Sequence, residues 1–239
     1  MTADRWTQTV RHQLGLGRLL PLGDARDGAW IAEQAAEAVL RRAVADAPGV
    51  RLDALRVALA DPADTGSPAV PAPPSGLPPG PLRVTAEFAA TASQPLPTTA
   101  SLLRATLATA ATQRLGLTVS EVDLRVTGLL DEEAEAPGLR GAPLPEPPRA
   151  AQAGGDDEGR VAAAALEVPG VLRLTGALGH PVHIEELPGD AALPHRHVRL
   201  ELAVREDHRA RDVARQVRTA VRTTLPDHPT VAVLVSGIG

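Results

Sequence analysis

The chain of 239 residues contains no cysteine. This absence excludes disulfide bridges, thiolate metal ligands and a cysteine nucleophile, and it leaves the redox compartment undetermined. Tyrosine, lysine and asparagine are also absent, and Phe88 is the only phenylalanine. Because these residue types share AT-rich codons, their joint absence indicates a GC-rich genome. With aromatic residues at 1%, the core must be built from Val, Leu and Ala.

Long apolar runs and positive net charge are missing as well. No stretch approaches the ~18 apolar residues of a membrane span, and Arg11 and Arg18 interrupt the apolar residues near the N-terminus, so we expect no signal peptide. The sequence therefore predicts a cytoplasmic protein without a direct membrane span. The formal net charge of -5 and the scarcity of aromatics argue against a nucleic-acid module, which is usually basic and often stacks bases on aromatic rings.

Apolar residues recur with the periods of strands and helices. Residues 197–239 predict a strand, then a helix with an apolar residue at every fourth position, then a second strand. The same order is predicted earlier, with strands near 50–60 and 82–88, a helix from Pro97 to Leu115 and a strand over 122–129. The alternation breaks at Asp53, which indicates a bulge. An Ala-rich helix is expected before each set, starting at Ala29 and at Arg160.

Short sequence landmarks repeat between the two halves. A Pro-Gly-Val turn occurs at 48–50 and again at 169–171, and the ending Val126-Thr127-Gly128-Leu129 recurs as Val235-Ser236-Gly237-Ile238. Each half therefore predicts the order helix, strand, strand, helix, strand. A strand–helix–strand crossover favours two parallel strands with the helix on one face of the sheet.

The predicted fold class is α+β, with two tandem two-layer sandwiches joined by a linker rich in Pro, Gly and acidic residues. The expected organisation along the chain is an N-terminal amphipathic segment (1–28), a first unit (29–130) with a solvated Pro-rich loop (62–80), a disordered linker (131–159) and a second unit (160–239).

These landmarks resemble the alkaline-shock-protein family, the envelope stress response proteins of bacteria. The turn Val168-Pro169-Gly170-Val171 is similar to the Val-x-Gly-Val turn of that family, and Pro97 stands where the family opens a helix with proline. The resemblance covers both predicted units as two diverged copies. It implies a non-enzymatic cytoplasmic scaffold or adaptor with no cofactor and no catalytic residue. It also implies recruitment to the inner face of the membrane by a membrane-anchored protein partner, and self-association.

Two surfaces are candidates for binding. On the last predicted helix, a stripe of arginines lies opposite Val213 and Val217. It is either an ordinary solvated face or a basic strip for anionic lipid, an acidic partner, or the chain's own acidic residues at 131–133 and 156–158. Near the N-terminus, an apolar stripe either covers the first unit or docks on a membrane or partner. The residues of the two surfaces are Arg211, Arg215, Arg218 and Arg222, and Trp6, Val10 and Leu14.

Histidines suggest an alternative function as a metal-binding protein or enzyme. If the strands around residues 187–194 pair as a hairpin, His195 and His197 share one face and His183 approaches from the other strand. Together with Glu185 these imidazoles would suit zinc. The competing interpretation is surface histidines at the mouth of a hairpin, since no metal-spacing motif is present. A P-loop and a nucleophile elbow are both absent from the sequence.

Overall fold

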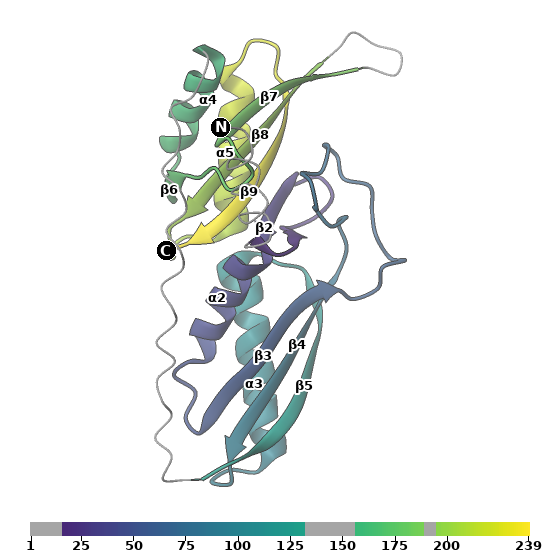
Figure 1. Cartoon of the computed structure of the whole chain (residues 1–239), viewed down its shortest axis with the longest axis vertical. Coiled ribbons are helices and arrows are strands. Elements are labelled where there is room, and N and C mark those ends of the chain that lie inside the picture. Colours follow the sequence, from purple (N-terminus) through teal and green to yellow (C-terminus); the bar gives the residue numbers. More distant parts are fainter. Residues whose placement is uncertain (1–15, 132–155, 189–194) are drawn as a thin grey trace, which may run out of the picture.

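The structure is a computed structural model, and it describes residues 16–131, 156–188 and 195–239. The described residues form a mixed α+β protein with two sheets (Figure 1). Its helices are α2 (Glu33–Val44), α3 (Leu96–Ala110), which continues as a π-helical turn (Ala111–Leu115), α4 (Asp156–Leu166) and α5 (Ala210–Thr224). Its strands are β1 (Leu19–Pro21), β2 (Ala29–Ala32), β3 (Val50–Leu59), β4 (Leu82–Thr91), β5 (Val119–Leu130), β6 (Val171–Leu174), β7 (Val182–Leu187), β8 (His195–Val204) and β9 (Thr230–Ile238).

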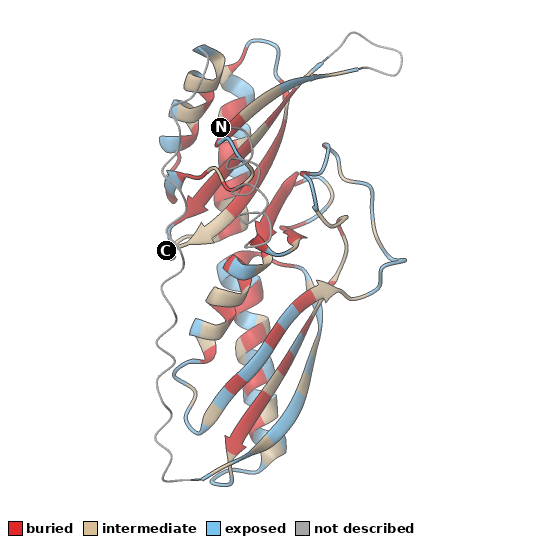
Figure 2. Ribbon diagram, viewed as in Figure 1, coloured by how far each residue is buried: buried red, intermediate tan, exposed pale blue. Residues whose placement is uncertain are grey.

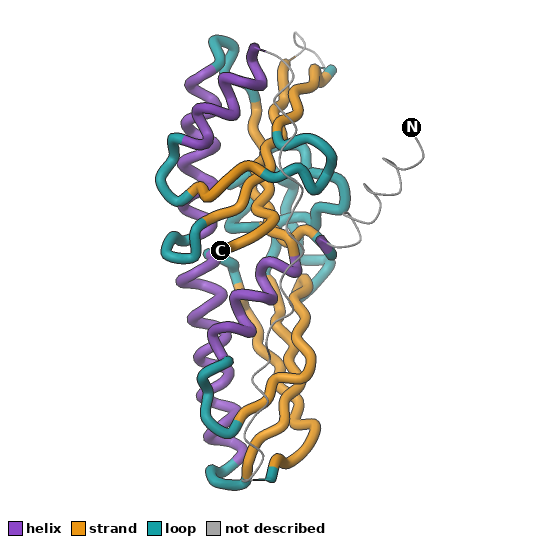
Figure 3. Tube along the Cα trace, turned by 60° about the vertical axis from the view of Figure 1, so that its left-hand side comes forward, coloured by secondary structure: helices purple, strands orange, loops and turns teal. Residues whose placement is uncertain are grey.

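Helices and strands lie in two layers along the length of the molecule (Figure 3). The smaller sheet has the strand order β3-β4-β5, and α2 and α3 pack on one of its faces. The larger sheet has the order β1-β2-β9-β8-β6, with β7 also paired to β8, and α4 and α5 contact it. Each helix therefore buries its apolar stripe against a sheet, as expected for amphipathic helices of this length.

The two sheets share the connection that the sequence predicts. β4 and β5 are parallel and joined through α3, while β8 and β9 are parallel and joined through α5. Both repeated endings lie at a bulge, because the register shifts between Val126 and Gly128 and again between Val235 and Gly237. The bulge predicted near Asp53 is also confirmed, since the register of β3 shifts there.

The segment that begins at Ala29 is a strand for its first residues, so the predicted helix start is wrong. Ala29–Ala32 forms β2, parallel to β9, and the helix begins at Glu33. Trp30 and Ile31 are 1% and 0% exposed, and burial against β9 outweighs the helix propensity of the neighbouring alanines. Consequently, β1 and β2 belong to the sheet that contains the C-terminal strand.

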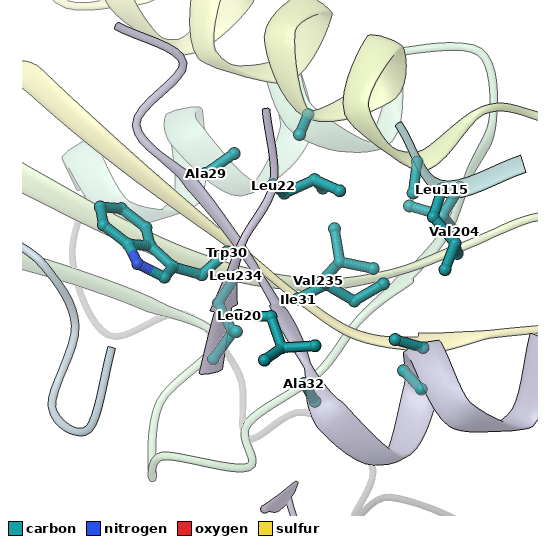
Figure 4. Close-up of a cluster of buried hydrophobic side chains, with 14 of the residues drawn as sticks. Leu20, Leu22, Ala29, Trp30, Ile31, Ala32, Leu115, Val204, Leu234 and Val235 are labelled. Atoms are coloured by element: carbon teal, nitrogen blue, oxygen red, sulfur yellow. The ribbon is translucent and has the colours of Figure 1, made fainter. Parts of the chain in front are cut away.

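Two self-contained sandwiches are not confirmed, because the buried apolar residues form one continuous cluster. α2 contacts β9, and the π-helical turn contacts α5. Figure 4 shows where the parts meet: Leu115 of the π-helical turn and Val204 of β8 lie in one cluster with Leu20, Leu22 and Ile31. The core therefore runs from one sheet into the other.

The Pro-rich segment 62–80 packs on the N-terminal strands, so the prediction of a solvated loop is wrong for part of it. Val70 is 3% exposed, and the backbone of Leu19 on β1 bonds to Ser75 and Leu77. The indole Nε1 of Trp30 donates to the carbonyl of Leu77 at 3.0 Å. Proline has no backbone N–H to donate. The residues between the prolines of this segment still form hydrogen bonds to β1 and so cover its edge.

The predicted linker 131–159 is described only at its two ends. Its last four residues, 156–159, open α4, so the linker is shorter than expected at that end. Asp156, Asp157 and Glu158 occupy the first turn of this helix, where negative charge is favoured by the helix dipole. Residues 132–155 lie outside the described residues.

Candidate functional site

The arginine stripe of α5 faces the turn between β1 and β2. Arg211 lies 2.8 Å from the carboxylate of Asp27, and Arg215 lies 2.7 Å from its other oxygen. Arg218 donates to the backbone carbonyl of Arg26. Asp27 is 2% exposed, so two guanidinium groups neutralise a carboxylate that is almost completely removed from water.

The conformation of this turn depends on its first glycine. Gly23 has φ of +97°, and a Cβ at this position would come within 2.0 Å of the Asp27 carboxylate and 2.6 Å of Arg211. The backbone amide of Asp24 donates to Asp27 at 2.8 Å, which holds the carboxylate inside its own turn. The turn thus needs a glycine at position 23, where φ is positive, and a side-chain acceptor at position 27 for its backbone amide.

Three of the four arginines of the stripe therefore bind the chain's own β1–β2 turn. The acidic partners that the structure shows for the stripe are Asp24 and Asp27, while Asp157, one of the predicted partners, pairs instead with Arg160 and Arg196. The predicted partners at 132 and 133 lie outside the described residues. Arg222 is exposed, and its backbone carbonyl accepts a hydrogen bond from His228. Sequence reasoning missed Asp27, although a turn signal of two glycines and two aspartates stands at 23–28.

The histidines lie on a confirmed antiparallel hairpin of β7 and β8. Its register sets His183 opposite Arg199, and Glu185 opposite His197, so these four residues and His195 share one face. His183 and Glu185 approach to 3.9 Å. His197 is 3% exposed, and its Nδ1 lies 2.8 Å from the hydroxyl of Thr230.

Burial governs the chemistry of His197. Desolvation lowers the pKa of His197, and this outweighs the nearby carboxylate of Glu185, which acts in the other direction. The neutral ring shares a hydrogen bond with Thr230 through one of its two nitrogens. Among the described residues, no group of three or more His, Asp or Glu side chains has the arrangement of a metal site.

A second buried titratable group, Glu201, was missed by sequence reasoning. It is 0% exposed on β8, where the alternation places a charged residue between Leu200 and Leu202. Both carboxylate oxygens lie 3.1 Å from the backbone amide of Leu178, in the loop between β6 and β7. Burial raises the pKa of Glu201 to about 7. Alternation does not reveal this burial, because β8 is a central strand whose residues from Leu200 to Val204 are all buried.

The strand β5 forms an open edge of the smaller sheet. It pairs with β4 only, and on its other side no strand is present among the described residues. Val126 and Leu129 are 41% and 66% exposed, and Figure 2 shows this strand mostly exposed or intermediate along its length. The carbonyl of Val122 accepts a hydrogen bond from the exposed side chain of Arg104 on α3 at 3.2 Å. Sequence reasoning predicted the strand but not its place at an edge.

Two other edge strands of the described chain, β1 and β3, have backbone groups bonded by segments other than strands. β1 is bridged to the Pro-rich segment at Gly76, and β3 carries a bulge while its Val57 carbonyl accepts a hydrogen bond from Arg18. Bulges and covering loops are the usual means of protecting a strand edge. β5 also carries bulges and has its Val122 carbonyl occupied by Arg104, so among the described edges it differs from β3 in its length of 12 residues and in the exposed side chains of Val126 and Leu129.

The predicted N-terminal surface cannot be placed, since Trp6, Val10 and Leu14 lie outside the described residues. In the part of the chain that the structure describes, no helix is long and apolar enough to cross a lipid bilayer.

Taken together, the fold defines an α+β protein of two mixed sheets that share one core, and among the described residues the long strand β5 pairs with another strand on one side only. No family model, no curated protein and no solved structure matches this chain. The resemblance to the alkaline-shock-protein family therefore stays a prediction.

Proposed function

We propose that this protein is a non-enzymatic scaffold or adaptor of the bacterial envelope stress response. In this proposal it works in the cytoplasm and is recruited to the inner face of the membrane by a membrane-anchored protein partner. The observation that carries the proposal is the open edge of β5. An uncovered edge offers a row of backbone donors and acceptors, which is how many proteins bind a further strand.

The chemistry around β5 supports binding of protein. Val126 and Leu129 are exposed apolar side chains on this strand, and apolar side chains beside an open edge give a strand partner contacts beyond its main chain. On the opposite face of the sheet, Arg83 pairs with Glu121, and Arg125 lies 3.7 Å from Glu87. Charged pairs of this kind keep that face in water and leave the edge as the contact.

We further propose that the two sheets descend from two tandem copies of one unit. The parallel pairs β4–β5 and β8–β9, each with a crossover helix and a bulge at the Val-x-Gly ending, support this origin. The strands β1 and β2 extend only the larger sheet, so the copies have diverged in how they complete their sheets.

The scaffold proposal is tested by cell fractionation and direct binding. The expected result is that the chain sediments with the membrane fraction, and that deleting one membrane-anchored protein releases it. That protein, once purified, should bind the purified full-length chain. A chain that stays with the soluble proteins under envelope stress, with no direct binding, would contradict the proposal.

Matched variants locate the surface. Leu129→Asp places a charge on the open edge, and Leu166→Asp places the same charge on α4, where the leucine is 52% exposed. The membrane-associated assembly should be lost with the first variant and kept with the second. Loss with both, or with neither, would remove β5 as the surface that carries the function.

A second candidate function is metal binding, and the observation behind it is the register of β7 and β8. It brings His183, Glu185, His195 and His197 to one face of the hairpin. Metal analysis of purified full-length protein tests this candidate. Stoichiometric zinc that disappears in a His195→Ala, His197→Ala double variant would favour it over the scaffold.

A further inference from the structure

The side chains of β5 divide into an apolar and a charged row. Five apolar residues of β5 pair in register with buried apolar residues of β4, so they lie on the helix-covered face of the sheet. Glu121, Asp123 and Arg125 pair with the polar residues of β4 and lie on the opposite face. The five apolar residues are Val119, Val122, Leu124, Val126 and Leu129.

This pattern is symmetric about Leu124. Val122 and Val126 stand two positions to either side of it, and Val119 and Leu129 stand five positions to either side. The charged neighbours are opposite in sign, with Asp123 before Leu124 and Arg125 after it. The two register shifts against β4 also fall on both sides, one after Val119 and one after Val126. A strand with this symmetry is complementary to an antiparallel copy of itself.

We infer that the occupant of the open edge is the β5 strand of a second copy of this chain, paired antiparallel about Leu124. This inference rests on the proposed scaffold function and names its first partner. In this arrangement Asp123 of each copy lies directly opposite Arg125 of the other, while Val122 lies opposite Val126 and Val119 opposite Leu129. The two smaller sheets become one continuous sheet with all helices on one face, and the interface is isologous.

The edge is prepared for such a strand. Arg104 of α3 donates to the outward carbonyl of Val122 from a side chain that is itself exposed, and the amide of an incoming strand would take its place. Asp123 and Arg125 have side chains 60% and 78% exposed, and their contacts within the chain are long, at 3.5 Å to Arg83 and 3.7 Å to Glu87. Both charges are therefore free to pair across the interface at little cost.

Charge reversal tests the pairing. Purified wild-type chain should form a dimer of twice the 24.8 kDa chain mass in sedimentation between about 1 and 100 µM. Arg125→Asp sets like charges opposite each other twice, as does Asp123→Arg, so each should raise the dimer dissociation constant at least about tenfold. The double variant, Asp123→Arg with Arg125→Asp, restores complementarity and should restore the dimer. Arg56→Asp, with the same charge change at an exposed position of β3, is the matched control.

Cysteine cross-linking tests the register, and the chain offers no competing thiol. Leu124 of one copy lies beside Leu124 of the other, with Cα atoms about 5.5 Å apart, within the span of a disulfide. The Leu124→Cys variant should therefore become a covalent dimer under mild oxidation. Glu121→Cys is more exposed, yet its two copies would be about 20 Å apart, so it should not cross-link.

The outcomes separate the inference from the function on which it rests. A wild-type monomer, single charge variants that dimerise like wild type, or cross-linking at residue 121 in preference to 124 would each overturn the self-pairing. A monomeric chain that still binds a membrane-anchored protein through β5 would keep the scaffold and replace the second copy by that protein. Circular dichroism of each variant checks that loss of the dimer is not loss of the fold.

Discussion

Two carboxylates that the fold removes from water show how differently a buried charge can be treated. Asp27 meets two guanidinium groups within 2.8 Å, whereas Glu201 meets only backbone amides of the β6–β7 loop and the more distant charge of Arg199. The first is compensated by opposite charge, and the second is compensated by taking up a proton. Asp27 ties the β1–β2 turn to α5, and Glu201 ties the β6–β7 loop to β8, so each contributes to stability in a way that a single substitution can measure.

Glu201 should make stability depend on pH around neutrality. Its pKa of about 7 in the folded chain exceeds the ordinary value of 4.5, so the folded state holds a proton that the unfolded state has released. The stabilisation is complete below pH 4.5 and is lost as the pH rises through 7, by about 3 kcal/mol. Glu201→Gln does not titrate, and it should match wild type at pH 5 and exceed it at pH 8 in urea unfolding.

The control for this experiment is Glu186→Gln, at an exposed position on the neighbouring strand β7. It should follow wild type at both pH values. His197, with its lowered pKa, loses stabilisation in acid, but that loss is common to all three proteins and cancels in their differences. Equal pH profiles for wild type and Glu201→Gln would show that the carboxylate is not held neutral by the fold.

Asp27 should be far more important for stability than its neighbour Asp24. Asp27→Asn leaves Arg211 and Arg215 without their shared carboxylate, and breaking a buried pair costs about 3 kcal/mol. The side chain of Asp24 is 60% exposed, and Asp24→Asn should cost less than about 1 kcal/mol. Urea denaturation of both variants measures the two costs. Similar costs would mean that the clamp on the β1–β2 turn contributes little.

At the scale of elements, local periodicity predicted the strands and helices whose partners follow directly along the chain. The crossovers β4–α3–β5 and β8–α5–β9 were predictable from their own residues. Apolar and polar residues alternate in the strands, and an apolar residue recurs at every fourth position of the helices. β2 was not, since Ala29–Ala32 becomes a strand only through β9, which lies some two hundred residues away. The same distinction between local and distant contacts holds for the candidate sites. The face shared by His195 and His197 was predictable from their spacing, but the contact of Asp27 with Arg215 was not, because the two residues are far apart in sequence.

The Pro-rich segment is an element whose role appears only after folding. Val70 is 3% exposed, and its neighbour Ala69 is exposed. Val70→Asp should therefore destabilise the chain by about 2 kcal/mol or more, since it buries an unpaired charge. Ala69→Asp should change stability by less than about 0.5 kcal/mol. Thermal unfolding of both variants separates a packed segment from a solvated loop, for which the two substitutions would be equivalent.

For the whole molecule, the shared core sets how the chain unfolds. The larger sheet takes β1 and β2 from the start of the chain and β6 to β9 from its end, and the smaller sheet lies between them in sequence. One continuous cluster of buried apolar residues joins the two. Two independent sandwiches would melt separately, whereas parts that share a core unfold together.

Calorimetry of the full chain should accordingly give one transition, with calorimetric and van't Hoff enthalpies that agree. A fragment of residues 156–239 should not fold alone, because β9 would lose β2 and expose Val233, Leu234 and Val235, all at most 1% exposed in the whole chain. Adding a separate fragment of residues 1–131 should restore the folded state, because it supplies that strand. Two transitions, or a stable 156–239 fragment, would instead favour two independent units, and would mean that β2 adds to a sheet already complete without it.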